Sequence, residues 1–283
     1  MTKALVFVLV MAVPTGSFAA EGLREGVLFS ESFDDGELTR RNWYDGTGFR
    51  IVGDSRASKG CIEYEWLGPD TKVSGSSSVR RLFEPTDEVC IRFYLKLSKG
   101  WGWTGRDYHP HLINFLTTEN SKWWGPAASH LTLYVEPQNG KLRLAAQDIQ
   151  NQNMPHGLTQ GSLKGGYNAK VYDSPTALFT DDKWHCVEAC FKLNTFKKDR
   201  PNPDGIVRGW FDGKLVIEHT NVILRSTDFP DMKFNQLLMA PYFGPCLLSH
   251  AQKLWIDELA VGVTRIGPLP ERKVPAREDD VSK

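Results

Sequence analysis

Several segments of this chain alternate apolar and polar residues, and their polar sides carry groups that can do chemistry. In segment 89–97 the odd-numbered residues are apolar, whereas Arg92 and Tyr94 fall on the other face of a strand. A guanidinium can neutralise an anion, and a phenol can exchange a proton. An aromatic ring can also pack against the apolar face of a ligand ring. The pattern therefore indicates a face that binds something polar and ring-shaped.

The same alternation yields a larger set of candidate residues. If the polar faces line one concave sheet, they gather Arg92, Tyr94, His130, Tyr134, Glu188, Trp210 and Tyr242. We expect four of these on one solvent-facing groove, namely Arg92, Tyr94, Glu188 and Trp210. The core side chains Ile91, Phe93, Val187 and Phe211 would lie opposite them.

Each candidate also has a structural alternative. Tyr242 could form an ordinary hydrogen bond at a strand end, and His130 could be an edge or core histidine. Arg92 could pair with Glu188 in a structural salt bridge.

The elements that must position these residues are strands. Strand-like runs alternate with Gly, Pro and Asp turns, and no long segment keeps a helical period. Asp212-Gly213 is the strongest hairpin signal. Long insertions at 100–129 and 151–182 interrupt the rhythm. The runs are 27–33, 49–52, 60–65, 78–83, 89–97, 111–117, 130–136, 141–147, 183–193, 205–211, 214–218, 235–241 and 253–261. The pattern predicts an all-β fold, an antiparallel two-sheet jelly-roll sandwich.

Composition and the termini indicate an exported protein. The 283 residues include 34 Lys+Arg and 34 Asp+Glu, so there is no basic excess for nucleic-acid binding. Residues 1–20 have the charged start, short apolar run and small-residue cleavage site of a signal peptide. A retained N-terminal anchor is the alternative, although the apolar run is too short to span a bilayer. We expect one domain at 21–269 and a disordered charged tail at 270–283. The mature protein would be secreted or periplasmic, free of the membrane and monomeric.

The five cysteines are an odd number. Cys186 and Cys190 lie four residues apart in a strand pattern, roughly 13 Å, which is too far for a disulfide. We expect buried thiols with at most one or two bridges. Cys90 with Cys190 across neighbouring strands is one candidate, but the sequence alone does not determine the pairing.

Three stretches resemble the concanavalin A-like jelly-roll superfamily. Residues 29–36 read Phe-Ser-Glu-Ser-Phe-Asp-Asp-Gly, like its opening strand. Residues 183–214 contain Trp-His-x-x-Glu, Lys-Leu-Asn, Asp-Gly and Trp-x-Asp-Gly-Lys in the order of its central hairpin. Residues 240–244 and 255–261 are similar to its last two strands. The resemblance is strongest to secreted polysaccharide lyases of the alginate and glucuronan lyase type, and it specifies the fold better than the activity.

A lyase of this type acts on uronic-acid polysaccharides by β-elimination. It neutralises the sugar carboxylate, removes the neighbouring proton and protonates the leaving oxygen. On this resemblance Tyr242 would be base and acid. His130 would be the partner base or the neutralising group, and Arg92 would pair with the sugar carboxylate. Tyr94, Tyr134, Glu188 and Trp210 would bind substrate, with Trp210 stacking on a sugar ring.

The resemblance has further implications for metals and for other activities. Catalysis needs no cofactor, but a structural Ca²⁺ often joins the first and last strands, and Glu31, Asp34 and Asp257 are the matching oxygen donors. Alternatively, residues 34–36 form an ordinary turn. A non-catalytic carbohydrate-binding module is the second hypothesis. A glycoside hydrolase is disfavoured, because the Glu-x-Asp-x-x-Glu strand of retaining glucanases is missing. The Arg-x-Glu-x-Arg and Gln-Ile-His strands of alginate lyases are missing too, and residues 78–82 only partly resemble the first of them.

Overall fold

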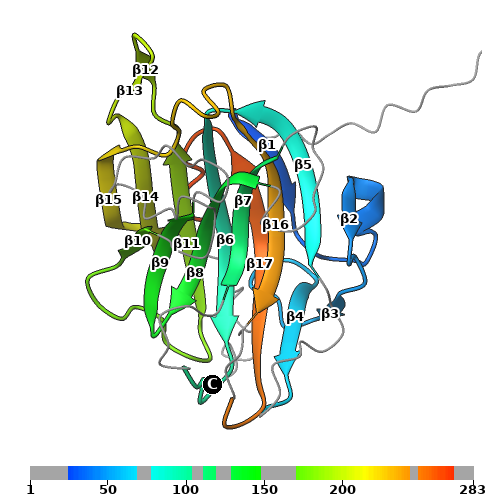
Figure 1. Ribbon diagram of the computed structural model, residues 1–283. Coiled ribbons are helices and arrows are strands. Elements are labelled where there is room, and N and C mark those ends of the chain that lie inside the picture. Colours follow the sequence, from blue (N-terminus) through cyan, green and yellow to red (C-terminus); the bar gives the residue numbers. More distant parts are fainter. Residues whose placement is uncertain are drawn as a thin grey trace, which may run out of the picture.

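The computed structural model describes residues 25–68, 78–103, 111–118, 129–147, 170–242 and 248–270. In these ranges the chain forms two large antiparallel sheets and a small hairpin, with one turn of 3-10 helix at Leu38–Arg41 and no α-helix (Figure 1). The prediction of an all-β, two-sheet jelly roll is confirmed. The predicted signal peptide and all of the predicted tail after Pro270 lie outside the described residues.

Sheet A is the first layer and contains eight strands. Its order is β15 (Lys214–Val222), β14 (Gly205–Phe211), β11 (Trp184–Lys192), β6 (Glu88–Leu97), β17 (Gln252–Gly262), β4 (Cys61–Trp66) and β3 (Arg50–Val52). Strand β1 (Val27–Glu31) also pairs with β17.

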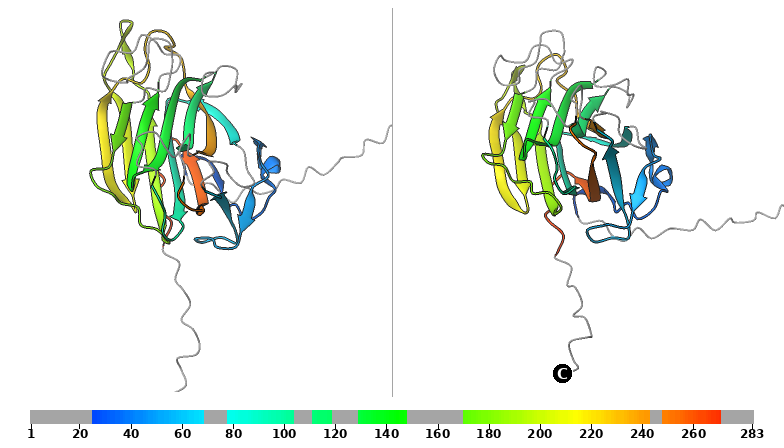
Figure 2. Two further views of the ribbon diagram at one scale, coloured as in Figure 1. Left: turned by 60° about the horizontal axis from the view of Figure 1, so that its bottom comes forward. Right: turned by 90° about the horizontal axis from the view of Figure 1, so that it is seen from below.

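Sheet B is the second layer, and Figure 2 shows both layers from two further directions. Its order is β10 (Lys170–Asp173), β9 (Lys141–Gln147), β8 (Ser129–Gln138), β7 (His111–Thr118), β16 (Phe234–Tyr242), β5 (Val79–Thr86) and β2 (Trp43–Asp45). The separate hairpin pairs β12 (Phe196–Lys197) with β13 (Arg200–Pro201).

The core fills the space between the two sheets. Alternation directs Ile91, Phe93, Val187 and Phe211 of sheet A into it, as the sequence predicted. Sheet B contributes Ile113, Phe115, Leu133 and Val135. The rings of Phe115 and Phe191 meet edge to face across the layers, with their centroids 6.3 Å apart. Both sheets therefore bury one face and turn the other away from the core.

Tight turns connect neighbouring strands, and one of them is the hairpin turn predicted at Asp212-Gly213. Asn139-Gly140 joins β8 to β9 with φ angles of 49° and 80°, and Asp212-Gly213 joins β14 to β15 with 47° and 79°. Two successive positive φ angles match the right-handed twist of a hairpin, and Asn or Asp followed by Gly adopts them at low cost. Every predicted strand run overlaps an observed strand, whereas the short strands β2, β10, β12 and β13 were not predicted.

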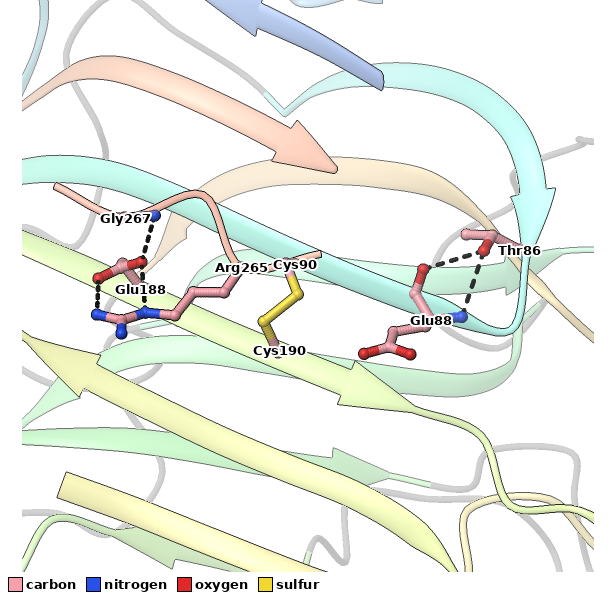
Figure 3. Close-up of a disulfide and its surroundings, with 7 residues drawn as sticks. All are labelled: Thr86, Glu88, Cys90, Glu188, Cys190, Arg265 and Gly267. Carbon is pink, nitrogen blue, oxygen red and sulfur yellow. Dashed lines mark hydrogen bonds and ion pairs between the residues drawn. A yellow bond between two sulfur atoms is a disulfide. The ribbon is translucent and has the colours of Figure 1, made fainter. Parts of the chain in front are cut away.

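A disulfide joins Cys90 of β6 to Cys190 of β11, which lie directly opposite each other (Figure 3). This is the pairing that the sequence offered as a candidate. Cys61 and Cys186 are free and buried, and Cys246 lies outside the described residues. No helix in the described ranges is long and apolar enough to cross a membrane.

Candidate functional site

The face of sheet B that points away from the core carries a regular array of polar side chains. We call a row of residues that are directly opposite one another on neighbouring strands a rung. One rung contains Gln236, Leu116, Thr132 and Gln147, in that order across the sheet. Asn114 and Tyr134 occupy the next rung. Phe115, Leu133 and Leu237 stand between these rungs in the sequence and point into the core. The polar residues therefore share the opposite face, which we call the polar face.

Three buried oxygens on the polar face have no hydrogen-bond partner in the part of the chain that the structure describes. They are Oδ1 of Asn114, Oγ1 of Thr132 and Oε1 of Gln236. An unpaired buried polar atom costs about 1–3 kcal/mol, so such atoms are uncommon away from ligands and ordered water. Three acceptors on adjacent strands suit a ligand rich in hydroxyl groups.

A histidine and a carboxylate form a hydrogen-bonded pair at one end of the polar face. Nδ1 of His111 lies 2.8 Å from Oε2 of Glu136, and the His111 ring stacks on Tyr134 with their centroids 4.5 Å apart. Both His111 and Glu136 are largely shielded from solvent. When Nδ1 carries the proton and donates a hydrogen bond to Glu136, the lone pair of the imidazole is on Nε2. This arrangement fixes the ring and equips it to accept a proton.

Further hydrogen bonds fix the phenols on this face. The hydroxyl of Tyr134 donates to Oε1 of Gln147 over 2.7 Å. The amide of Gln236 donates to the Tyr44 hydroxyl, also over 2.7 Å. Burial raises the pKa of Tyr44, while the charge of the neighbouring Arg80 opposes that shift. Tyr44 therefore keeps its proton at neutral pH and can donate it.

Two arginines border the polar face on opposite sides. Arg143 makes two hydrogen bonds to Asp173, of 2.7 and 2.9 Å, beside Glu136. Arg80 pairs with Asp45 and shares a rung with Asn114. Burial lowers the pKa of Arg80 to about 10, so it remains cationic at neutral pH. Both guanidinium groups are thus paired with aspartates, one at each edge of the face.

Two predicted catalytic residues, Tyr242 and His130, lie in sheet B. The backbone of Tyr242 is opposite that of His111, but its side chain lies outside the described residues. His130 is buried and stacks on Phe229, with the ring centroids 3.6 Å apart, beside a hollow of about 530 Å³. It is four residues from Tyr134 along β8, which corresponds to roughly 13 Å. Tyr134 lies on the polar face. The catalytic roles of Tyr242 and His130 and the binding role of Tyr134 remain predictions.

The seven candidates do not line one sheet, so the condition under which they would form one site is not met. Arg92, Tyr94, Glu188 and Trp210 do share a face, but it belongs to sheet A and points away from sheet B. Nor is that face a solvent-facing groove, since residues 265–269 of the chain contact Glu188, Trp210 and Tyr94 there, and each of the four side chains is at most 8% exposed.

The segment 263–270 covers this part of sheet A, and we call it the strap. Arg265 donates two hydrogen bonds to Glu188, of 3.2 and 3.0 Å, and the amide of Gly267 donates another (Figure 3). The Arg265 guanidinium lies 4.6 Å from the Trp210 ring centroid. The amide of Leu269 donates to the Tyr94 hydroxyl. These residues therefore hold the strap in place.

The three carboxylates that would match a calcium site do not fit one. Glu31 accepts hydrogen bonds from Arg41, Trp43 and the amide of Phe33. Asp257 accepts from the amides of Arg56 and Glu258 and from the Ser58 hydroxyl. Asp34 caps the backbone amides of Lys59 and Gly60. No cluster of three or more metal-binding side chains occurs among the described residues. These carboxylates are thus satisfied by N–H and O–H donors.

Comparison with solved structures finds this fold in polysaccharide lyases. The structure is similar to alginate lyase vAL-1 from Chlorella virus, with a TM-score of 0.62 and 13% identity over 84% of this chain and 100% of that one. It is also similar to the PL-14 alginate lyase from Aplysia kurodai, with a TM-score of 0.58 and 13% identity, covering 86% and 99% of the two chains. A third similar structure is a mutant of alginate lyase Aly36B in complex with alginate tetrasaccharide. Its TM-score is 0.53 and its identity 15%, over 86% of this chain and 94% of that one.

No protein-family model matches the sequence, and no curated protein does. At such low identities the structural likeness shows the jelly-roll fold of polysaccharide lyases, and the activity must be argued from the site.

Proposed function

We propose that this protein is a secreted polysaccharide lyase that cleaves an acidic, uronic-acid polysaccharide by β-elimination on the polar face of sheet B. The observation that carries the proposal is the His111–Glu136 pair, stacked on Tyr134 beside unpaired buried acceptors. The lyase fold supports it, because the solved relatives by structure include alginate lyases. Secretion rests on the signal-like sequence of residues 1–20.

β-Elimination from a uronic acid requires three groups in reach of one sugar. A base removes the proton next to the carboxylate, the electron pair forms a double bond, and the glycosidic oxygen leaves with a proton from an acid. The proton becomes acidic enough only when the carboxylate charge is neutralised. The polar face offers a candidate for each of these tasks.

In the proposed assignment His111 and Tyr242 handle the protons. Glu136 orients His111 as the base, and Tyr242 is its neighbour across the β7–β16 pairing. Arg80 and the Asn114 amide flank the position of the substrate carboxylate, since they share one rung with Leu238 between them. That rung places their strands two spacings apart, roughly 9.5 Å, with Leu238 between them on the same face, so a sugar would lie over Leu238. Tyr134 and Gln236 would bind sugar hydroxyls.

The test is incubation of the purified protein with polymannuronate, polyguluronate and polyglucuronate. Elimination creates an unsaturated sugar end that absorbs ultraviolet light, whereas hydrolysis creates a reducing end without this absorbance. His111→Ala should abolish the absorbance and leave binding of the polymer nearly intact. Leu215→Ala, an exposed residue on sheet A, is the matched control and should keep wild-type activity.

Two other outcomes would replace the proposal. Binding without new absorbance on any of these polymers would support a carbohydrate-binding module. New reducing ends without absorbance would support a glycoside hydrolase.

A further inference from the structure

A second surface, on the outer side of sheet A, combines two tryptophans with a lysine. Trp184 of β11, Lys96 of β6 and Trp255 of β17 lie in one rung across three neighbouring strands. The Lys96 ammonium lies 5.5 Å from the Trp184 ring centroid and 4.5 Å from that of Trp255. We call this rung the aromatic platform. It lies on the opposite side of the sandwich from the polar face.

Differences in burial show how the platform is built. Lys96 is only 7% exposed, whereas both tryptophans are partly exposed. The two rings therefore shield the lysine and present part of their own surface to solvent. A hydrogen bond of 2.9 Å from Nε1 of Trp255 to Glu63 also fixes one ring. Rigid, partly exposed aromatic rings lose little entropy when a ligand packs on them.

The charges beside the platform are already compensated. Lys96 pairs with Asp54, and Arg50 and Lys253 both pair with the buried carboxylate of Glu63. These three cations are thus committed to protein carboxylates and do not select an anionic ligand. What remains available is the aromatic surface, which packs against apolar C–H groups.

We propose that the aromatic platform is a second polysaccharide-binding site, which holds an extended chain by the flat faces of its pyranose rings. The strands that carry Trp184 and Trp255 are two spacings apart, roughly 9.5 Å, so the rings can engage two positions along one chain. Because Lys96, Arg50 and Lys253 are paired with protein carboxylates, binding should not require sugar carboxylates. The platform would anchor the protein on a polymer while the polar face acts independently.

The experiment measures binding to insoluble cellulose and to a soluble neutral β-glucan, at low and at high salt. The wild type should bind at least one of them with little salt dependence. Trp184→Ala should weaken that binding about tenfold, the order expected for the loss of one stacked ring. Trp184→Phe should recover part of the affinity. Trp184 is the first choice because Trp255→Ala also removes a hydrogen bond from buried Glu63.

The controls separate the platform from the polar face. Leu215→Ala removes another exposed apolar side chain from sheet A and should bind like the wild type. His111→Ala should also keep neutral-polymer binding, even if it abolishes cleavage of polyuronates. The platform proposal is overturned if the wild type binds neither neutral polymer or if Trp184→Ala binds as tightly as the wild type. Neither result would bear on the polar face.

Discussion

Nδ1 of His111 lies 2.8 Å from Oε2 of Glu136, and the two residues come from neighbouring strands of sheet B. A buried carboxylate that accepts a hydrogen bond from the Nδ1–H group fixes the tautomer and the orientation of the imidazole. The same ring stacks on Tyr134, so its orientation is set on a second side. The pair therefore has the geometry of a general base with its orienting group.

The first prediction concerns Glu136. Glu136→Gln should lower the turnover number about 100-fold and change polymer affinity little, because it leaves His111 in place without its anionic partner. Initial rates of product absorbance and polymer-binding isotherms measure both effects. A variant with an unchanged rate would remove Glu136 from the mechanism.

The second prediction concerns Tyr242. Tyr242→Phe removes one hydroxyl and little stacking area, so turnover should fall by about 10²–10⁴-fold with affinity nearly intact. Single-turnover rates and binding isotherms, compared with the wild type, provide the measurement. Retention of full activity would show that another group carries the proton.

Much of the fold could be predicted from the sequence, because strand alternation and Asn-Gly or Asp-Gly turns are local signals. The face of each strand was also predicted correctly within sheet A, where Arg92, Tyr94, Glu188 and Trp210 lie together. The assignment of strands to sheets was not predictable, since it depends on pairings between distant segments. Cys90 and Cys190, for example, are 100 residues apart.

The candidate site was only partly predictable for the same reason. His111 belonged to a predicted strand run, but simple alternation would place it on the core side with Ile113 and Phe115. The pairing of β7 with β16 is irregular between Met239 and Tyr242, and the His111 ring instead contacts Tyr134. An irregularity of this kind leaves no signal in a single sequence. The sequence of the strap likewise contains no pattern that indicates which face of the sandwich it covers.

The third prediction tests the strap. Arg265→Ala removes two hydrogen bonds from Glu188, whose side chain is only 1% exposed. The free energy of unfolding should fall by about 2 kcal/mol, because hydrogen bonds to a buried charge contribute more than neutral ones. Arg265 itself is partly exposed, which keeps the loss below that of a fully buried pair. Urea denaturation measures the loss.

Variants that weaken the attachment of the strap should not change the catalytic rate of the folded protein. Arg265→Ala and Trp210→Ala should both keep the wild-type rate per folded molecule, since the strap and Trp210 lie on sheet A. A selective loss of substrate affinity in Trp210→Ala would instead support the original prediction that its ring binds sugar.

The fourth prediction concerns the disulfide between β6 and β11. Replacing Cys90 and Cys190 together with alanine should lower the free energy of unfolding by about 3–4 kcal/mol, because the bond closes a long loop in the unfolded chain. Reductant should destabilise the wild type and leave the double variant unchanged. Equal stability of the two proteins under oxidising conditions would show that the bond contributes nothing.

The last prediction concerns Glu258, which is half-buried next to Asp257 in β17. Burial raises the pKa of Glu258 above its ordinary value of 4.5, and the charge of Asp257 raises it further. Ionisation is therefore less favourable in the folded than in the unfolded state. Stability associated with this carboxyl is present below pH 4.5 and is lost as pH rises through the folded pKa.

Glu258→Gln keeps the side chain neutral and should make the protein more stable than the wild type at neutral pH. The difference should shrink as pH falls and disappear below about 4.5, where the wild-type carboxyl is protonated in both states. Thermal unfolding of both proteins between acidic and neutral pH measures the effect. Glu84→Gln, which removes an exposed carboxylate, is the matched control for the loss of one charge. A lower stability of Glu258→Gln at neutral pH would mean that the ionised carboxylate stabilises the fold.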